Sequence, residues 1–331
     1  MSTDITIIEL EKQSSQGLQE SKLILQFSGK LASTTLTNSL RRCALNNIPT
    51  YAFDPNTIYI DGNSSIFDND EMRCRISQII IPEITVPVIH LENKYWKDID
   101  FGDTNRPKHP KDKMLIEFYI NARNDTTSVM NVTTNDADIY IDSDSVKKID
   151  AAFPHLVIQL KPKQIFKCRA VAQLGIGLKN NIWSGAANSY YDELSENKIK
   201  FTILSQGQMH EYDILYRSCI VIQKELLFLK HIFKNSIDKH KTKDIKLKID
   251  NYDYTVCGIL NEFLQSHNDV IFSAISKPDH LISQIVITLK TNKNHPIDIL
   301  FEVVDHLVKV YENIKNQLMK LGKKHITLSS E

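Results

Sequence analysis

The chain has 331 residues, enough for two or three domains that each bury a hydrophobic core. Lys plus Arg and Asp plus Glu both number 40, and this zero net charge argues against a freely acting nucleic-acid-binding protein, which would carry a basic excess. No apolar run reaches the roughly 18 to 20 residues that cross a bilayer, and the acidic N-terminal segment does not resemble a secretory signal. We therefore expect a soluble intracellular protein that acts through protein partners and not through a membrane.

The five cysteines are scattered along the chain, and none of them forms a CxxC pair. Zinc knuckles and redox motifs depend on such spacing. We therefore expect most of these thiols to be buried, with no metal and no cofactor bound.

The first predicted elements are two short strands, at residues 6–8 and 23–27, followed by a helix. The helix is predicted by an apolar stripe at helical spacing, and Pro49 ends it because the residue before a proline disfavours the α conformation. Arg41 and Arg42 lie beside the stripe, which consists of Leu36, Leu40, Cys43 and Ala44.

The segment from Tyr51 to about Asn197 has no long helical pattern and is rich in strand and turn signals. Strands are expected at residues 57–61, 79–81, 115–120, 139–141 and 156–160. The charged, proline-containing stretch 94–113 is expected to be an exposed, mobile loop. This composition predicts a β-dominated insert.

Helical periodicity then returns in a pattern whose steps alternate between three and four residues. It runs through Leu215, Cys219, Ile222, Leu226, Leu229 and Phe233. A polar linker (239–246), a strand (246–250), a short helix near 258–266 and two strands (270–275 and 284–289) are expected to follow.

A long helix is predicted to open at Pro296, since proline is favoured at the first helical position. Its apolar residues again alternate steps of three and four, which is the seam of a helix that packs lengthwise on another helix. They are Ile297, Leu300, Val304, Leu307, Tyr311, Ile314, Leu318 and Leu321.

The chain thus contains two units of similar order: strand, short helix, further strands and one long seamed helix. The two seams can bury each other, and each fully buried large aliphatic side chain contributes about 1.5 to 3 kcal/mol. The pattern alone leaves open a second arrangement, in which each long helix packs on the sheet of its own unrelated domain.

The order of the arginine helix, Ile48-Pro49-Thr50 and the following strand resembles the α-like subunits of multisubunit DNA-directed RNA polymerases. These comprise the bacterial α N-terminal domain, the third-largest eukaryotic subunit and its archaeal counterpart. The resemblance continues through Asp70-Glu71, Arg73, Arg75 and Ile81-Pro82, then through residues 166–172, 175–177 and 183–184, although Arg73-Cys74-Arg75-Ile76 replaces the family's usual His-Arg-Leu step.

The last third of the chain resembles the smaller partner of that family, the eleventh eukaryotic subunit and its archaeal counterpart. The matching segments are residues 252–258, with departures at Tyr254, Val256 and Cys257, and Pro278-Asp279-His280. The two partners are normally separate chains, and their fusion resembles the arrangement in large nucleocytoplasmic DNA viruses.

The resemblance implies an α+β fold with two dimerisation units, each an antiparallel sheet plus a long helix, paired within one chain. The first unit would comprise residues 1–52 and 199–238, interrupted by the β-rich insert at 53–198. After the linker at 239–246, the second unit would span 247–325.

The implied function is a non-catalytic assembly platform that docks the two large catalytic polymerase subunits and small subunits. DNA and RNA would be met only through the complex, and no self-dimer is expected. Arg41 and Arg42 are the first candidates for contacts with the second-largest subunit, since arginine pairs bidentately with carboxylates and carbonyls. Arg73 and Arg75 are weaker candidates, and a viral protein would work in the host cytoplasm or viral factory and enter the virion.

Two other functions remain open from the residues. Asp136, Asp138, Asp142 and Asp144 could hold a magnesium ion in an independent metal-dependent enzyme, although such acidic runs are usually solvated. The chain could also be a homodimeric protein-binding module.

Overall fold

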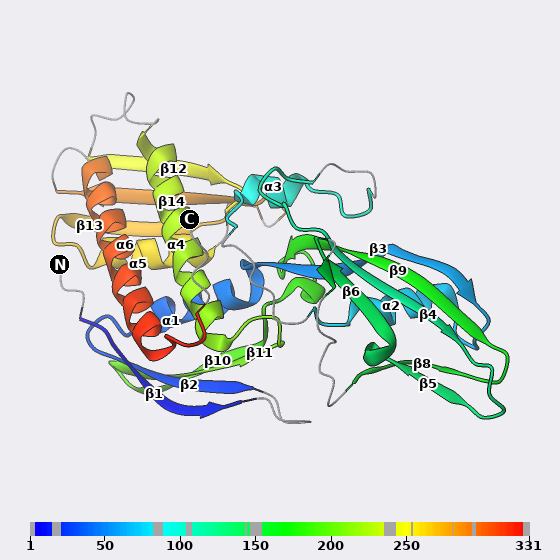
Figure 1. The fold of residues 1–331 in the computed structure, drawn as a ribbon. Helices are drawn as coiled ribbons and strands as arrows, with labels where there is room; N and C mark the ends of the chain where they lie inside the picture. Colours follow the sequence, from blue (N-terminus) through cyan, green and yellow to red (C-terminus); the bar gives the residue numbers. More distant parts are fainter. Residues whose placement is uncertain are drawn as a thin grey trace.

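A computed structural model describes residues 4–14, 21–81, 89–103, 108–142, 144–145, 154–234, 243–252, 254–279, 281–292 and 296–326. Figure 1 shows two parts: a helix-rich body and an elongated, β-rich insert that projects from it. Each part has a hydrophobic core of its own.

The first unit of the body is an antiparallel sheet covered by two helices. Its strand order is β1-β2-β11-β10, and its elements are β1 (Thr6–Gln13), β2 (Lys22–Ser28), α1 (Thr34–Asn46), β10 (Ala186–Ser195), β11 (Lys198–Ser205) and α4 (Glu211–Lys234). Helix α1 begins where the Ser33 side chain accepts a hydrogen bond from the Leu36 amide, an N-cap, and it ends at the Asn47 C-cap.

The second unit repeats this plan with a three-stranded antiparallel sheet in the order β12-β14-β13. Its elements are β12 (Asp244–Asp250), α5 (Tyr254–Gln265), β13 (Val270–Ser276), β14 (Gln284–Thr291) and α6 (Pro296–Leu321). Buried and exposed residues alternate along β12, as expected of a sheet with one face on the core and one in water.

The insert is built on a five-stranded antiparallel sheet in the order β3-β9-β4-β6-β7 and a two-stranded pair, β5-β8. Its elements are β3 (Pro49–Asn63), α2 (Asn69–Ser77), α3 (Asn93–Asp98), β4 (Ile116–Arg123), β5 (Met130–Thr133), η1 (Thr134–Asp136), β6 (Ala137–Ile141), β7 (Asp144–Ser145), β8 (Leu156–Leu160), β9 (Ile165–Ile176) and η2 (Asn181–Trp183).

The fold class is the one expected, α+β with two similar units in one chain. Two local predictions in the insert differ from the structure. Residues 79–81 form no strand, because α2 occupies 69–77 and its exit buries Ile81 in the insert core without a strand partner. The stretch expected as a loop at 94–113 begins inside α3, where Trp96 is only 4% exposed.

Two predicted boundaries also differ from the observed elements. Strand β10, which was expected within the insert, pairs with β11 in the body, so we propose that the insert ends near residue 185. Strand β12 starts at Asp244, inside the expected linker, and residues 239–242 of that linker lie outside the described residues. The division into domains otherwise stays a prediction.

Candidate pairing interface

The two long helices, α4 and α6, pack against each other in opposite directions along the middle of the body (Figure 1). Near the start of α4, Tyr212 lies against Gly322, just beyond the end of α6. Further along α4, the Gln223 amide donates hydrogen bonds to the Val308 carbonyl and to a Glu312 carboxylate oxygen, both at 3.0 Å. A later position on α4 thus meets an earlier position on α6, which defines an antiparallel pair.

The residues predicted for internal pairing are all buried, and they lie in one core that draws on both units. They are Leu36, Leu40, Leu215, Ile222, Leu226, Leu229, Phe233, Ile297, Leu300, Val304, Leu307, Tyr311, Ile314 and Leu318. The alternative arrangement, in which each helix packs only on its own sheet, is therefore not the one observed.

Helix α1 is joined to α6 by a buried polar contact. The Ser39 and Tyr311 hydroxyl oxygens lie 2.5 Å apart, and Ser39 also donates to the Leu36 carbonyl at 2.6 Å. Because the single Ser39 hydroxyl hydrogen is used on Leu36, Tyr311 must donate to Ser39. Burial raises the pKa of Tyr311, so the phenol keeps this proton.

Helix α1 also packs against α5, its counterpart in the second unit. Arg42 Nε donates to the Thr255 hydroxyl oxygen at 2.9 Å, and the Ser33 hydroxyl donates to Glu262 at 3.2 Å. One of the two arginines predicted to bind an outside partner, Arg42, therefore takes part in a contact between the two units.

The other predicted arginines lie in different environments. Arg41 is half-buried, and its Nε donates at 3.0 Å to Asn38 on the same helix. Arg73 and Arg75 lie on α2, which packs on the core of the insert, whereas Arg41 and Arg42 lie on α1 in the body. The structure therefore does not bring the two arginine pairs together.

Both α2 arginines hold that helix on the insert. Arg73 donates to the Ile58 carbonyl at 3.2 Å and pairs with Asp70 at 2.7 Å. Arg75 donates to the Val157 carbonyl at 3.2 Å and lies over the Phe67 ring. Their side chains are nevertheless 38% and 43% exposed, so both also face solvent.

A second set of contacts between the units, which the sequence pattern does not indicate, lies where α6 meets the edge strand β1. The Gln317 side-chain amide donates to the Ile5 carbonyl at 2.8 Å, and its oxygen accepts from the Ile7 amide at 2.8 Å. A side chain thus takes the place of a neighbouring strand at an edge that would otherwise present unpaired backbone groups.

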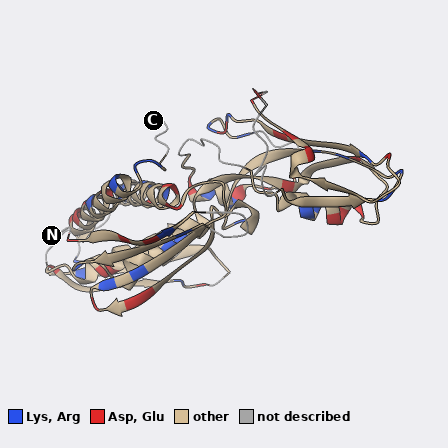
Figure 2. Cartoon of the chain, turned by 60° about the horizontal axis from the view of Figure 1, so that its bottom comes forward, with Lys and Arg blue, Asp and Glu red and all other residues tan. Residues whose placement is uncertain are grey.

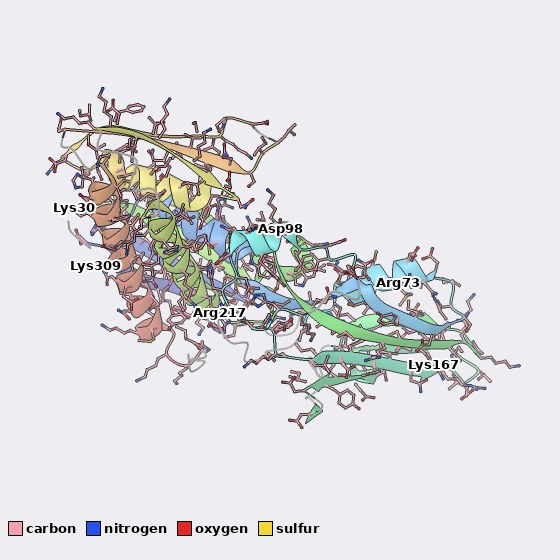
Figure 3. The ribbon with its side chains drawn as sticks, turned by 90° about the horizontal axis from the view of Figure 1, so that it is seen from above. Lys30, Arg73, Asp98, Lys167, Arg217 and Lys309 are labelled. Carbon is pink, nitrogen blue, oxygen red and sulfur yellow. The ribbon has the colours of Figure 1, made fainter. Side chains whose placement is uncertain are left out.

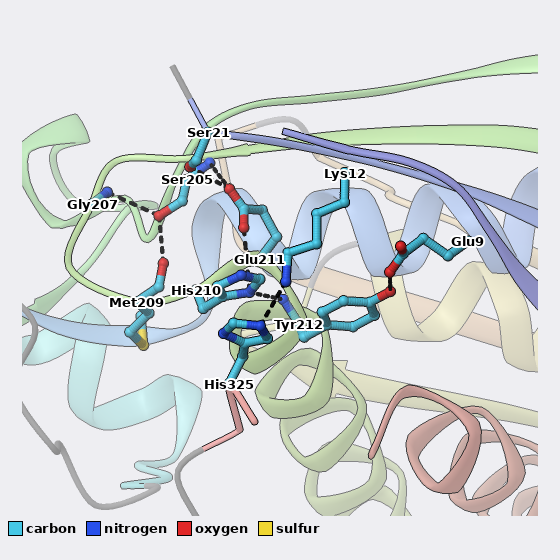
Figure 4. Close-up of polar contacts among 10 residues, drawn as sticks. All are labelled: Glu9, Lys12, Ser21, Ser205, Gly207, Met209, His210, Glu211, Tyr212 and His325. Carbon is cyan, nitrogen blue, oxygen red and sulfur yellow. Dashed lines mark hydrogen bonds and ion pairs between the residues drawn. The ribbon is translucent and has the colours of Figure 1, made fainter. Parts of the chain in front are cut away.

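A polar cluster lies beside this edge, at the start of α4 (Figure 4). The rings of His210 and His325 stack with centroids 3.9 Å apart, and Lys12 Nζ lies 2.6 Å from His325 Nε2. The Tyr212 hydroxyl donates to Glu9. Burial, then the nearby His325 and Lys12, lowers the pKa of His210 to about 4, so this ring is neutral near pH 7.

Two of the four aspartates considered for magnesium, Asp136 and Asp142, accept hydrogen bonds from backbone amides. Asp136 accepts hydrogen bonds from the Thr133 amide and hydroxyl, and Asp142 accepts from the Leu115 amide. Within the described ranges, no group of three or more His, Cys, Asp or Glu side chains is arranged to hold a metal ion.

In the cartoon of Figure 2, positions occupied by Lys or Arg and positions occupied by Asp or Glu are interspersed along both the body and the insert. In the described part of the chain, no helix combines the length and the hydrophobicity needed to cross a bilayer.

The paired units correspond to a known sequence family. The profile of the RNA polymerase Rpb3/Rpb11 dimerisation domain matches residues 27–226, and a second profile of that description matches residues 244–317. The chain belongs to the RNA polymerase Rpb3/Rpb11 dimerisation family. The resemblance to polymerase α-like subunits is thereby confirmed, and it extends to both units.

Two curated relatives agree with this assignment. A protein of Acanthamoeba polyphaga mimivirus, described as a DNA-directed RNA polymerase subunit, is 24% identical over 328 residues, covering 91% of this chain and 92% of the relative. Subunit 3 of the Arabidopsis thaliana DNA-directed RNA polymerases II, IV and V is 24% identical over 258 residues, covering 70% of this chain and 78% of the relative. The chain is a structural assembly subunit of a DNA-directed RNA polymerase.

Proposed function

We propose that the chain is the non-catalytic platform on which the two large catalytic subunits of the polymerase dock, and that its two units replace the two chains of a heterodimer. The observation that carries this proposal is the single core shared by both units, with α4 and α6 antiparallel at its centre. A core closed within one chain leaves no seam for a second copy, so we expect a monomer when the chain is alone.

The mimivirus relative supports a viral setting, because it matches this chain over nearly its full length and is itself described as a polymerase subunit. On this proposal the chain works where viral transcription takes place and enters the virion with the polymerase. Small polymerase subunits would bind the same platform, and DNA and RNA would be reached only through the complex, in keeping with the zero net charge.

Arg41 is our first candidate for contact with the second-largest subunit. Its hydrogen bond is local, to Asn38, so its guanidinium can pair with a partner without disrupting the contact between the units. Arg42 would contribute to docking in two ways. Its hydrogen bond to Thr255 would hold the two units together, and its side chain would also contact the partner subunit. Arg73 and Arg75 remain secondary candidates because their first role is to hold α2.

The test is capture of the second-largest subunit by the full chain. Arg41→Ala, alone and combined with Arg42→Ala, should reduce capture while circular dichroism stays that of the parent. Arg123→Ala is a matched control, since this arginine is 69% exposed on the insert and paired with Asp125. Unchanged capture by both the single and the double variant would remove the arginines from the docking site.

The platform itself is tested by mass and activity. The isolated chain should be monomeric by light scattering at all concentrations, and it should have no magnesium-dependent turnover. A stable homodimer would favour a homodimeric binding module, and turnover that is lost when Asp142 and Asp144 are replaced would favour an enzyme.

A further inference from the structure

A buried carboxylate lies where the insert meets both units of the body. Glu225 is on α4, and its side chain is only 7% exposed. The side-chain amide of Asn93, at the start of α3, donates to one of its oxygens at 3.0 Å. His90 Nε2 lies 3.6 Å from the other oxygen. Both partners belong to the segment that leads into α3.

The second unit reaches the same place through Tyr252, which precedes α5 and is only 4% exposed. Burial, then the nearby Glu225 carboxylate, raises the pKa of this phenol. Its hydroxyl oxygen nevertheless forms no hydrogen bond of normal geometry with any described residue. Glu225 therefore faces groups from the insert and from the second unit at once.

A small cavity adjoins the carboxylate and is lined by residues from four regions: the α1–β3 junction, α3 and the residues before it, the end of β9, and α4. They are Asn47 and Pro49 at the α1–β3 junction, His90, Leu91, Asn93 and Trp96 around α3, and Ile176, Val221 and Glu225. The cavity thus lies at the junction between the body and the insert.

The same junction is also held by a second set of contacts. The Thr50 hydroxyl donates to the Trp183 carbonyl at 2.6 Å, and the Trp183 indole donates to the Gln173 carbonyl at 2.9 Å. Strands β3 and β9 continue from this junction into the insert. The covalent connection alone would therefore permit the insert to bend relative to the body.

We propose that Glu225 is a positioning residue that fixes the orientation of the insert, with α3 as a strut between the insert and α4. The energetic reason is that burying a hydrogen-bond acceptor without its donor costs more free energy than the net gain from the hydrogen bond itself. Any tilt that withdraws Asn93 would take the hydrogen-bond donor away from this buried oxygen. Contacts between apolar groups are less directional than a hydrogen bond, so on their own they specify the tilt less sharply.

The inference rests on the proposed function in one respect: a fixed insert would present one defined surface for the large subunits to bind. The orientation itself is a property of the chain alone and can be measured without them. Loss of docking with an intact orientation, and loss of orientation with intact docking, are therefore separate results.

The test is a distance distribution between two labels on the full chain. Cys74 on α2 is an exposed native thiol, while the other four cysteines are buried. The second label goes on Lys309→Cys, at an exposed position of α6. Figure 3 shows Lys309 and Arg73, a neighbour of Cys74 in sequence, in opposite parts of the molecule, with Asp98 of α3 between them.

The parent should give one narrow distance peak. Glu225→Leu, which keeps the bulk and removes both acceptors, should broaden and displace it. Asn93→Ala, which removes the hydrogen-bond donor on the insert, should broaden and displace the peak in the same way. It tests the proposal by itself if Glu225→Leu does not fold. Glu302→Gln on α6, where the side chain is 64% exposed, is the control and should leave the peak unchanged. An unchanged peak in both test variants, or a parent distribution that is already broad, would overturn the proposal.

Discussion

Arg42 Nε donates a hydrogen bond of 2.9 Å to the hydroxyl oxygen of Thr255, and this contact joins the first helix of one unit to the first helix of the other. The same arginine is one of the two that we propose for contact with the second-largest subunit. Its neighbour Arg41 donates instead to Asn38 within its own helix. Two adjacent arginines of one motif thus have different partners, and their effects on stability and on docking can be separated.

We expect Arg42→Ala to lower the free energy of unfolding by about 1 to 3 kcal/mol, since a hydrogen bond to a charged donor is lost between the units. Arg41→Ala should change it by no more than about 0.5 kcal/mol. Urea unfolding of the single variants measures both values. A double-mutant cycle with Thr255→Val should give a coupling of about 1 kcal/mol, and additive effects would show that the bond does not stabilise the pairing.

The long helices could be predicted from the sequence because periodicity is a local property. The alternating steps from Leu215 to Phe233 and from Ile297 to Leu318 lie within the observed α4 and α6. The short helix α2 has no such stripe. It depends on its Asp68 N-cap and on the contacts of its two arginines to distant carbonyls, so a short window of sequence does not reveal it.

The polar contacts between the units were beyond prediction for a different reason. Gln317 lies more than 300 residues from Ile5 and Ile7, and a glutamine on a helix face gives no sign of its partner. Glu225 is similar, because its environment is set by the fold of the insert. The sequence therefore predicts which residues are apolar and internal, whereas the directional contacts require the structure.

The hydroxyl contact between α1 and α6 provides a second prediction. Tyr311→Phe removes only the donor to Ser39, so we expect a loss of about 1 kcal/mol, with the ring still filling its place in the core. Tyr311→Ala should cost about 3 to 5 kcal/mol, because it leaves a cavity between the units. Thermal and urea unfolding distinguish the two. An equal loss for both variants would mean that the ring itself contributes little.

We expect the stability of the chain to depend on pH through His210, one of the two stacked histidines. The pKa of His210 is about 4 in the folded chain and near 6.5 when unfolded, so between these values the unfolded state binds a proton that the folded state does not. Stability should therefore fall as the pH is lowered from about 6.5 to 4, by on the order of 2 kcal/mol from this ring, after allowance for its partial exposure.

His210→Gln should flatten that part of the stability profile, whereas His231→Gln, at an exposed position of α4, should not. Chemical unfolding at a series of pH values gives the profile for each variant. A parent and a His210→Gln profile with the same slope would show that His210 titrates normally in the folded chain.

Two glycines should respond in opposite ways to substitution by alanine. At Gly177, a Cβ atom would lie 2.0 Å from the Leu45 carbonyl oxygen, a backbone atom that cannot move aside without shifting the end of α1. Gly177→Ala should therefore lower the free energy of unfolding by about 1 to 3 kcal/mol. Urea unfolding measures the loss, and a variant as stable as the parent would show that the end of α1 can shift at little cost.

Gly258 lies inside α5, where the atom nearest to an added Cβ is Thr35 Cγ2 at 4.0 Å, so alanine fits. Because glycine is a poor helix former, Gly258→Ala should stabilise by up to about 1 kcal/mol. Urea unfolding beside Gly177→Ala checks the contrast. A destabilised Gly258→Ala would mean that α1 and α5 approach more closely than this packing allows, and that the glycine serves the pairing of the two units.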